Sequence, residues 1–132
     1  MKKILALDDD PEILKCLKVA LEQRGFAATT CSNFTDFTRL FHDQSPDLVL
    51  VDIRMPGKNG FEVVKKLREW KNIPVLFVTA YSGSFTLESK PVLELWRTEF
   101  SGGLIDILYK PFDIATLYEK VESLIGKAGD EE

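Results

Sequence analysis

Four short apolar runs in this chain each end on side chains that suit metal and phosphate chemistry. In chain order, the runs and the residues that follow them are Ile4–Leu7 with Asp8, Asp9 and Asp10; Leu48–Val51 with Asp52; Val75–Val78 with Thr79; and Ile107–Tyr109 with Lys110. Carboxylates bind hard divalent cations such as Mg²⁺, and hydroxyl and ammonium groups hold phosphate oxygens. A carboxylate nucleophile beside a metal ion and a cation suits phosphoryl transfer through an acyl phosphate.

The elements that carry these residues follow from the pattern of apolar side chains. Short, continuously apolar runs are typical of parallel strands that are buried on both faces. Segments with apolar residues at helical spacing lie between the runs, and this alternation predicts a doubly wound α/β fold. Ligands of such sheets bind outside the carboxyl ends of the strands. We therefore expect Asp8, Asp9, Asp52, Thr79 and Lys110 to meet at one edge of the sheet.

Capping and turn residues mark where the helices begin and end. Asp10 followed by Pro11 predicts an N-cap with proline at the first helical position. Asn33 with Asp36 three residues later resembles a capping box. The predicted helices cover about residues 11–24, 34–44, 61–71 and 112–125, with a further helix near 92–100, and a weaker strand covers Phe26–Cys31.

Composition and charge exclude several classes of function. The 132 residues, 45% of them hydrophobic, fit one domain, and the net charge of −4 argues against a nucleic-acid-binding surface. No apolar run is long enough to span a bilayer, and acidic residues interrupt the N-terminal run before it could act as a signal peptide. Cys16 and Cys31 lack metal-binding spacing and are interpreted as reduced hydrophobic residues. We expect a soluble, cytoplasmic domain that binds neither membrane nor nucleic acid.

The sequence resembles the receiver domain of two-component response regulators over nearly its whole length. The matching stretches are Ile4–Asp9, Leu48–Gly60 with the segment VDIRMPGKNG, Val75–Ala80 (VLFVTA) and Lys110–Phe112 (KPF). The resemblance implies a flavodoxin-like, five-stranded parallel sheet in the order 2-1-3-4-5 with five surrounding helices. It also implies a receiver domain over residues 1–126, followed by a disordered acidic tail or the start of a linker over 127–132.

The resemblance implies a role for each residue of the acidic edge. Asp52 would be the phosphorylation site. Asp9 and Asp52 would bind Mg²⁺, or alternatively Mn²⁺, directly. Asp8 would hold the metal through a water molecule, and the backbone carbonyl of Arg54 would complete the protein ligands.

Two further residues complete the expected catalytic set. Thr79 and Lys110 would contact the phosphoryl group, with Lys110 pairing with Asp52 when no phosphoryl group is bound. The Lys110–Pro111 peptide bond is expected to be cis, as in relatives.

The same resemblance predicts the activity and the partners. The domain would take a phosphoryl group from a sensor histidine kinase or a phosphotransfer protein and then hydrolyse its own acyl phosphate. It would not turn over external substrates. Phosphorylation would shift the face formed by the fourth helix, fifth strand and fifth helix toward a downstream protein, an output domain or a second copy in a dimer.

Three features depart from the usual receiver pattern or are expected to tune the reaction. Ile107 stands where receivers usually carry an aromatic residue three positions before the lysine. The stretch between Thr79 and Lys110 exceeds that of typical receivers by roughly two to three helical turns, which predicts a lengthened loop or a docking surface. Arg54 and Tyr81, each two residues beyond a site residue, are predicted to restrict the attacking water and slow dephosphorylation.

Two alternatives remain open at this stage. The chain could be a degenerate receiver that acts as a phosphorylation-independent interaction module, an interpretation that Ile107 and the lengthened stretch favour. It could also be a phosphatase of the haloacid dehalogenase type, whose DxDx(T/V) motif begins at Asp8. Glu12 stands where that motif requires threonine or valine, and the chain is short for that family.

Overall fold

A computed structural model describes residues 1–55, 57, 59–80 and 105–129 of the chain. Its strands are β1 (Lys3–Leu7), β2 (Ala27–Cys31), β3 (Leu48–Val51), β4 (Val75–Ala80) and β5 (Ile105–Lys110). Its helices are α1 (Pro11–Gln23), α2 (Phe34–Gln44), α3 (Gly60–Trp70) and α5 (Ile114–Ile125). The helix expected near residues 92–100, and with it the lengthened stretch and Tyr81, lies outside the described residues.

The five strands form one parallel sheet in the order β2-β1-β3-β4-β5, which confirms the predicted topology. The register places Leu7 opposite Val51, Val51 opposite Phe77, and Phe77 opposite Ile107. The next residues of β1 and β3 therefore leave the sheet at one level, where the Asp52 amide donates to the Leu7 carbonyl at 3.0 Å. This register brings the ends of the apolar runs to a common edge.

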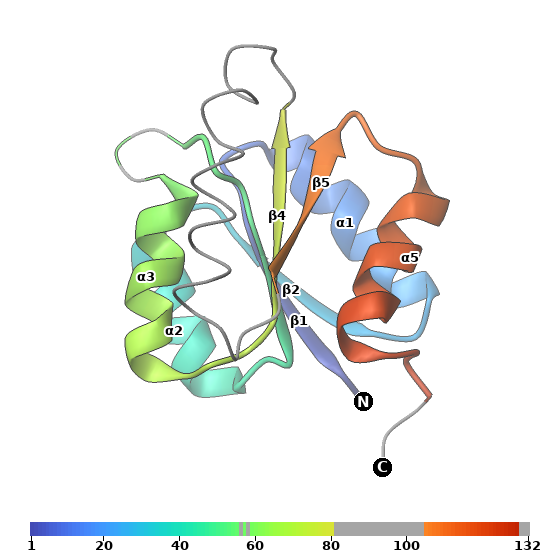
Figure 1. Cartoon of the computed structure of the whole chain (residues 1–132), viewed down its shortest axis with the longest axis horizontal. Coiled ribbons are helices and arrows are strands. Elements are labelled where there is room, and N and C mark those ends of the chain that lie inside the picture. Colours follow the sequence, from blue (N-terminus) through green and yellow to red (C-terminus); the bar gives the residue numbers. More distant parts are fainter. Residues whose placement is uncertain (56, 58, 81–104, 130–132) are drawn as a thin grey trace.

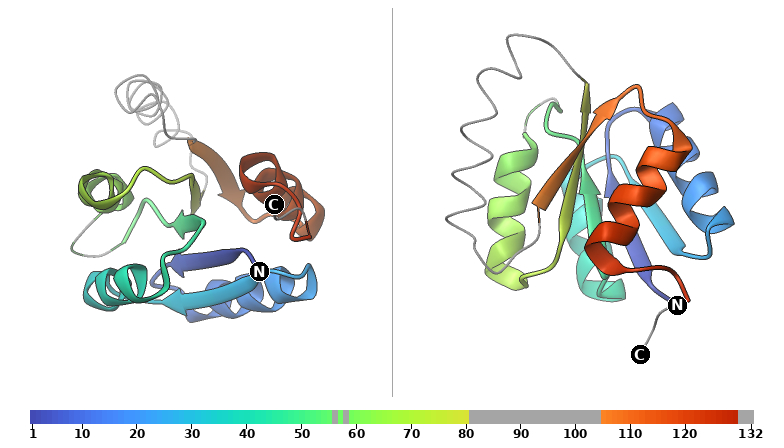
Figure 2. Two further views of the ribbon diagram at one scale, coloured as in Figure 1. Left: turned by 90° about the horizontal axis from the view of Figure 1, so that it is seen from below. Right: turned by 45° about the vertical axis from the view of Figure 1, so that its right-hand side comes forward.

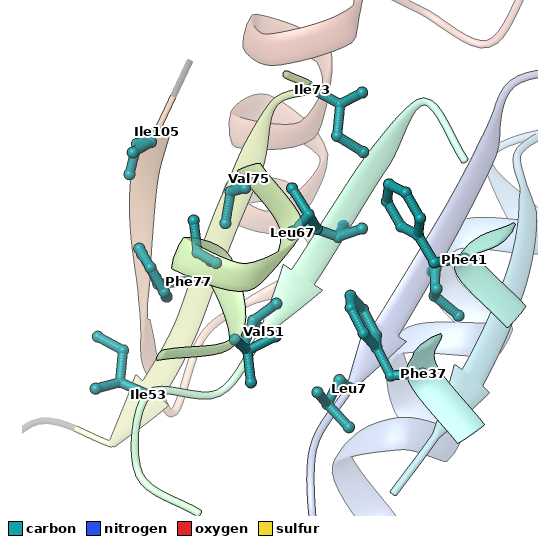
Figure 3. Packing of buried hydrophobic residues seen from close by; sticks show 14 of the residues in the cluster. Leu7, Phe37, Phe41, Val51, Ile53, Leu67, Ile73, Val75, Phe77 and Ile105 are labelled. Atoms are coloured by element: carbon teal, nitrogen blue, oxygen red, sulfur yellow. The ribbon is translucent and has the colours of Figure 1, made fainter. Parts of the chain in front are cut away.

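Helices cover both faces of the sheet, as Figure 1 shows. On one face, α2 and α3 bury Phe37, Phe41, Val63, Val64 and Leu67 against the strands, the packing seen from close by in Figure 3. On the other face, α1 and α5 bury Leu14, Leu17, Ala20, Leu21, Leu117 and Val121. The two further views in Figure 2 show the same separation into two helix layers. The fold is therefore the doubly wound one that the sequence predicts.

The strand residues alternate between the two cores. In β1, Leu5 and Leu7 belong to the core under α2 and α3, whereas Ile4 and Ala6 belong to the core under α1 and α5. The same alternation along β3, β4 and β5 is continued by the site residues at the strand ends. By this alternation Asp8, Asp52 and Lys110 fall on the α1 and α5 side of the sheet. Thr79 falls on the opposite side, the same side as Phe77.

Side-chain caps fix the helix starts close to their predicted positions. The Asp10 carboxylate accepts from the Glu12 amide at 3.0 Å, and the Asn33 side chain accepts from the Asp36 amide at 2.8 Å. The last helix begins two residues later than predicted, because Asp113 caps it. Among the described residues, no helix is long and apolar enough to cross a membrane.

Candidate metal and phosphate site

Three carboxyl groups meet at the carboxyl edge of the sheet. Ligand oxygens of Asp8, Asp9 and Asp52 all lie within 4.8 Å of one another. Asp8 and Asp52 are 2% and 5% exposed, whereas Asp9 is exposed. Carboxylates crowded at such distances repel one another, and a hard divalent cation relieves that repulsion. The donor set therefore fits Mg²⁺, as the sequence predicts.

Lys110 lies between the two buried carboxylates. Its Nζ donates to Asp8 Oδ2 at 2.9 Å and to Asp52 Oδ2 at 3.5 Å. Burial by itself would lower the pKa of Lys110, but the bond to Asp8 and the charges of Asp8 and Asp52 outweigh it and raise the pKa. The ammonium group is therefore charged at neutral pH. The sequence predicts a pair with Asp52, and the lysine contacts both carboxylates, with the shorter contact to Asp8.

The Asp52 carboxyl is held in an environment that disfavours its charge. Burial first, and then the neighbouring Asp8, raise its pKa from 3.8 to about 6, against the lowering effect of Lys110 and of the Arg54 amide. That amide donates to Asp52 Oδ1 at 3.2 Å. A second positive charge at this edge would restore the ionised, nucleophilic form. Without such a charge, the Asp52 carboxyl is partly protonated at mildly acidic pH.

Thr79 contributes a hydroxyl that is buried without a partner. The residue is fully buried at the end of β4, and its Oγ1 has no hydrogen-bond partner within the described part of the chain. A buried hydroxyl left unpaired costs on the order of 1–3 kcal/mol. An oxygen-rich group at this edge would satisfy it. Sequence reasoning placed Thr79 after the strand, whereas it forms part of β4.

Gly60, at the start of α3, lets that helix pack directly on the backbone of the Asp52 turn. A Cβ at this position would lie 2.6 Å from the Asp52 carbonyl oxygen and 2.8 Å from the Ile53 Cα. The Gly60 amide also donates to the Ile53 carbonyl at 2.8 Å. Gly60, the glycine of the NG pair, is therefore required by the lack of space, since its φ does not lie in the left-handed region. It fixes the backbone that presents Asp52.

The remaining predicted positions have distinct outcomes. The Lys110–Pro111 peptide bond is cis, as expected. Arg54 follows Asp52 in the β3–α3 loop and is exposed, with its amide directed at Asp52. Ile107 is buried beside Phe77 in the core under α2 and α3. An apolar side chain thus fills the position at which an aromatic residue is usual.

The fold and site define a doubly wound α/β domain whose sheet edge carries three carboxyl groups and a lysine, a set that suits a divalent cation and a phosphoryl group. Comparison with known proteins makes the assignment specific. Residues 4–122 match the family model of the response regulator receiver domain, and the chain belongs to that family. Its acidic pocket of Asp8, Asp9 and Asp52 is consistent with a phosphorylatable aspartate and with Mg²⁺ binding.

The similar proteins are two-component response regulators. NisR, the nisin biosynthesis regulatory protein of Lactococcus lactis subsp. lactis, is 36% identical over 123 residues, which cover 93% of this chain and 50% of NisR. CpxR, a transcriptional regulatory protein of Escherichia coli strain K12, is 34% identical over 128 residues, covering 97% of this chain and 51% of CpxR. The chain spans about half the length of these curated relatives.

Solved structures show the same fold. The response regulator TrrA of Thermotoga maritima, solved in complex with Mg²⁺ and BeF, superposes with a TM-score of 0.77 at 32% identity. The match covers 95% of this chain and all of TrrA. Chemotaxis protein CheY4 of Vibrio cholerae gives a TM-score of 0.76 at 26% identity, over 95% of this chain and 99% of CheY4.

Proposed function

We propose that Asp52 accepts a phosphoryl group from the phosphohistidine of a sensor histidine kinase or of a phosphotransfer protein. The observation that carries this proposal is the placement of Asp52: buried, within ligand distance of two further carboxylates, and 3.5 Å from the Lys110 ammonium. One Asp52 carboxylate oxygen forms the new bond to phosphorus as the phosphorus–nitrogen bond breaks. The electron pair of that bond returns to the imidazole nitrogen of the donor.

The surrounding residues would bind the group that is transferred. Asp9 and Asp52 would hold Mg²⁺ directly, Asp8 through a water molecule, and Arg54 through its backbone carbonyl. The bound cation would neutralise carboxylate and phosphoryl charge. Lys110 would move its hydrogen bond from Asp8 to a phosphoryl oxygen.

The unpaired hydroxyl of Thr79 supports a sensing role for that residue. A phosphoryl oxygen within reach would accept its hydrogen bond, which the described part of the chain leaves unmade. By the alternation of strand residues, Thr79 falls on the side of the α2 and α3 core, whereas Asp52 and Lys110 fall on the other side of the sheet. A phosphoryl group held by all three would therefore act on both helix layers at once.

Receiver domains work with histidine kinases, and we propose that this chain also acts on a partner through its switching surface. The switching surface would act on a downstream protein, an output domain or a second copy of the chain, in a cytoplasmic phosphorelay. The TrrA complex with Mg²⁺ and BeF supports such a switch by similarity.

The test is phosphorylation by a small phosphodonor. Wild-type protein incubated with acetyl phosphate and Mg²⁺ is expected to gain the mass of one phosphoryl group, on the peptide that contains Asp52. Intact and peptide mass spectrometry measure this gain. The Asp52→Asn variant and wild type in excess chelator should remain unmodified. A folded wild-type protein that gains no phosphate would contradict the proposal and favour the phosphorylation-independent module.

A second expectation concerns the lifetime of the acyl phosphate. Arg54 follows Asp52 by two residues and lines an open cavity of about 400 Å³ beside the site. We expect Arg54→Ala combined with Tyr81→Ala to shorten the lifetime several-fold, because smaller side chains leave more room for the attacking water. Timed quenching with mass spectrometry measures the decay. An unchanged lifetime would contradict the prediction that Arg54 and Tyr81 restrict the attacking water. Lys65→Ala, on the exposed face of α3, serves as the control.

A further inference from the structure

A second cavity opens beside the acidic site, on the side away from Lys110. Its volume is about 250 Å³, and its apolar lining comes from Leu7, Phe34, Met55 and Val63. Leu7 and Val63 are 1% and 0% exposed, so the accessible apolar surface of the cavity comes from the half-buried Phe34 and Met55, above the core under α2 and α3. An engineered apolar cavity of about 150 Å³ is large enough to bind benzene. This one can therefore hold a single ring or a branched aliphatic group.

The polar side chains of this cavity are Asp9, Ser32 and Asn33. The Asn33 amide is already engaged, because its Oδ1 accepts from the Asp36 amide and its Nδ2 donates to Asp36 Oδ2. Asp9 and Ser32 are exposed, and their side chains have no hydrogen bond or ion pair within the described residues. The mouth thus offers a carboxylate and a hydroxyl as acceptors above an apolar floor.

The acidic groups beside the mouth of this cavity favour a positively charged ligand. Within the described residues, Asp8, Asp9 and Asp52 gather beside this mouth, and the Lys110 ammonium group already pairs with Asp8 and Asp52. An anion entering here would meet this acidic excess, whereas a cation would be attracted. A primary ammonium group carries three donors, which suit the acceptors of Asp9 and Ser32.

We propose that this cavity binds a small amphipathic cation, with a primary ammonium group on Asp9 and Ser32 and an apolar body against Phe34 and Met55. Such a ligand shares Asp9 with the metal site. Because binding free energies are coupled reciprocally, Mg²⁺ should weaken the amine, and the amine should weaken Mg²⁺ by the same factor. The cavity would make receipt of the phosphoryl group sensitive to cationic metabolites.

The test uses benzylammonium as the probe and benzyl alcohol as its uncharged counterpart. In metal-free wild-type protein, titration followed by the ¹³C-methyl signal of Met55 should show saturable binding of benzylammonium in the millimolar range. Benzyl alcohol should bind about three- to tenfold more weakly, as should benzylammonium after saturation with Mg²⁺. Methyl signals across the protein locate the bound probe.

Variants decide whether the contacts are those proposed. Asp9→Asn should weaken benzylammonium about three- to tenfold and leave benzyl alcohol unchanged. Ser32→Tyr, at an exposed position that tolerates a larger side chain, should obstruct the mouth and weaken both probes. Asp43→Asn, on the exposed face of α2, is the matched control and should change neither.

Three results would overturn the proposal: equal binding of the two probes to wild type, unchanged benzylammonium binding in Asp9→Asn, or signal changes confined to residues outside the cavity. The measurement involves no phosphoryl transfer. Failure here would therefore leave the proposed role of Asp52 untouched, and failure of phosphorylation would leave the cavity untouched.

Discussion

Replacing Lys110 with methionine is expected to slow phosphorylation by acetyl phosphate by about 10²–10³-fold, the usual effect of removing one preorganised donor to developing charge. Methionine keeps the length and the apolar stem of the lysine but removes its charge and its three donors. The phosphoryl oxygens that Lys110 would bind then lose a partly buried cation, whose side chain is 16% exposed. The rate is followed by mass spectrometry at saturating Mg²⁺.

The same substitution should destabilise the metal-free protein. Removing one partner of a buried ion pair costs about 3–5 kcal/mol when the other charge is left unpaired. Here the cost is smaller, about 1–3 kcal/mol, because Asp52 can take up a proton as its pKa of about 6 rises further. Urea unfolding measures the change in the free energy of unfolding.

Lys120→Met is the matched control for this experiment. Lys120 also contacts a carboxylate near β5, Asp106 at 3.4 Å, but in a more exposed setting. It should leave the phosphorylation rate within about threefold of wild type and cost no more than about 1 kcal/mol. A Lys110→Met rate as close to wild type as that of the control would show that Lys110 does not bind the transferred group.

Asp52→Asn should stabilise the metal-free protein at pH 8 by about 1–3 kcal/mol. The pKa of Asp52 rises from 3.8 to about 6 on folding, so ionising this carboxyl opposes the folded state. As pH rises from about 4 to 6, the unfolded chain loses this proton first, and the contribution of Asp52 to stability falls. Above pH 6 to 7 the full cost is present, and asparagine removes it.

Urea unfolding with chelator at pH 4.5 and pH 8 measures this difference. The variant should gain little at pH 4.5 and the full amount at pH 8. Asp43→Asn, whose side chain is 65% exposed, should show no comparable gain at either pH. An Asp52→Asn protein that is equally stable or less stable than wild type at pH 8 would mean that Lys110 already compensates the buried charge.

The sequence predicts most of the fold because several local signals agree. The apolar run Leu48–Val51 coincides with β3, and the caps at Asp10 and Asn33 begin helices where expected. A doubly wound sheet then requires the strand ends to share an edge, so the meeting of Asp8, Asp9 and Asp52 follows from topology alone. Local propensity and global pattern point to one answer here.

What the sequence misses depends on side-chain geometry across distant segments. The shorter contact of Lys110 with Asp8 than with Asp52 depends on side-chain positions at the sheet edge, and the cavity beside Asp9 depends on how Met55 and Phe34 pack. The last helix was expected to begin at Phe112 and to bury Ile114. Asp113 caps it instead, and Ile114 is 40% exposed. The roles assigned to Tyr81 and to the stretch after it remain predictions.

The alternation of strand residues between two cores also decides which substitutions can rescue one another. A loss of volume at Phe77 is felt by α2 and α3, whereas one at Val78 is felt by α1 and α5, although the two residues are adjacent. Suppressors of a defect should therefore be found across the sheet within one layer rather than along the chain. The two sets of residues meet at the acidic site on the carboxyl edge of the sheet. A substitution in either layer can therefore alter the chemistry of that site.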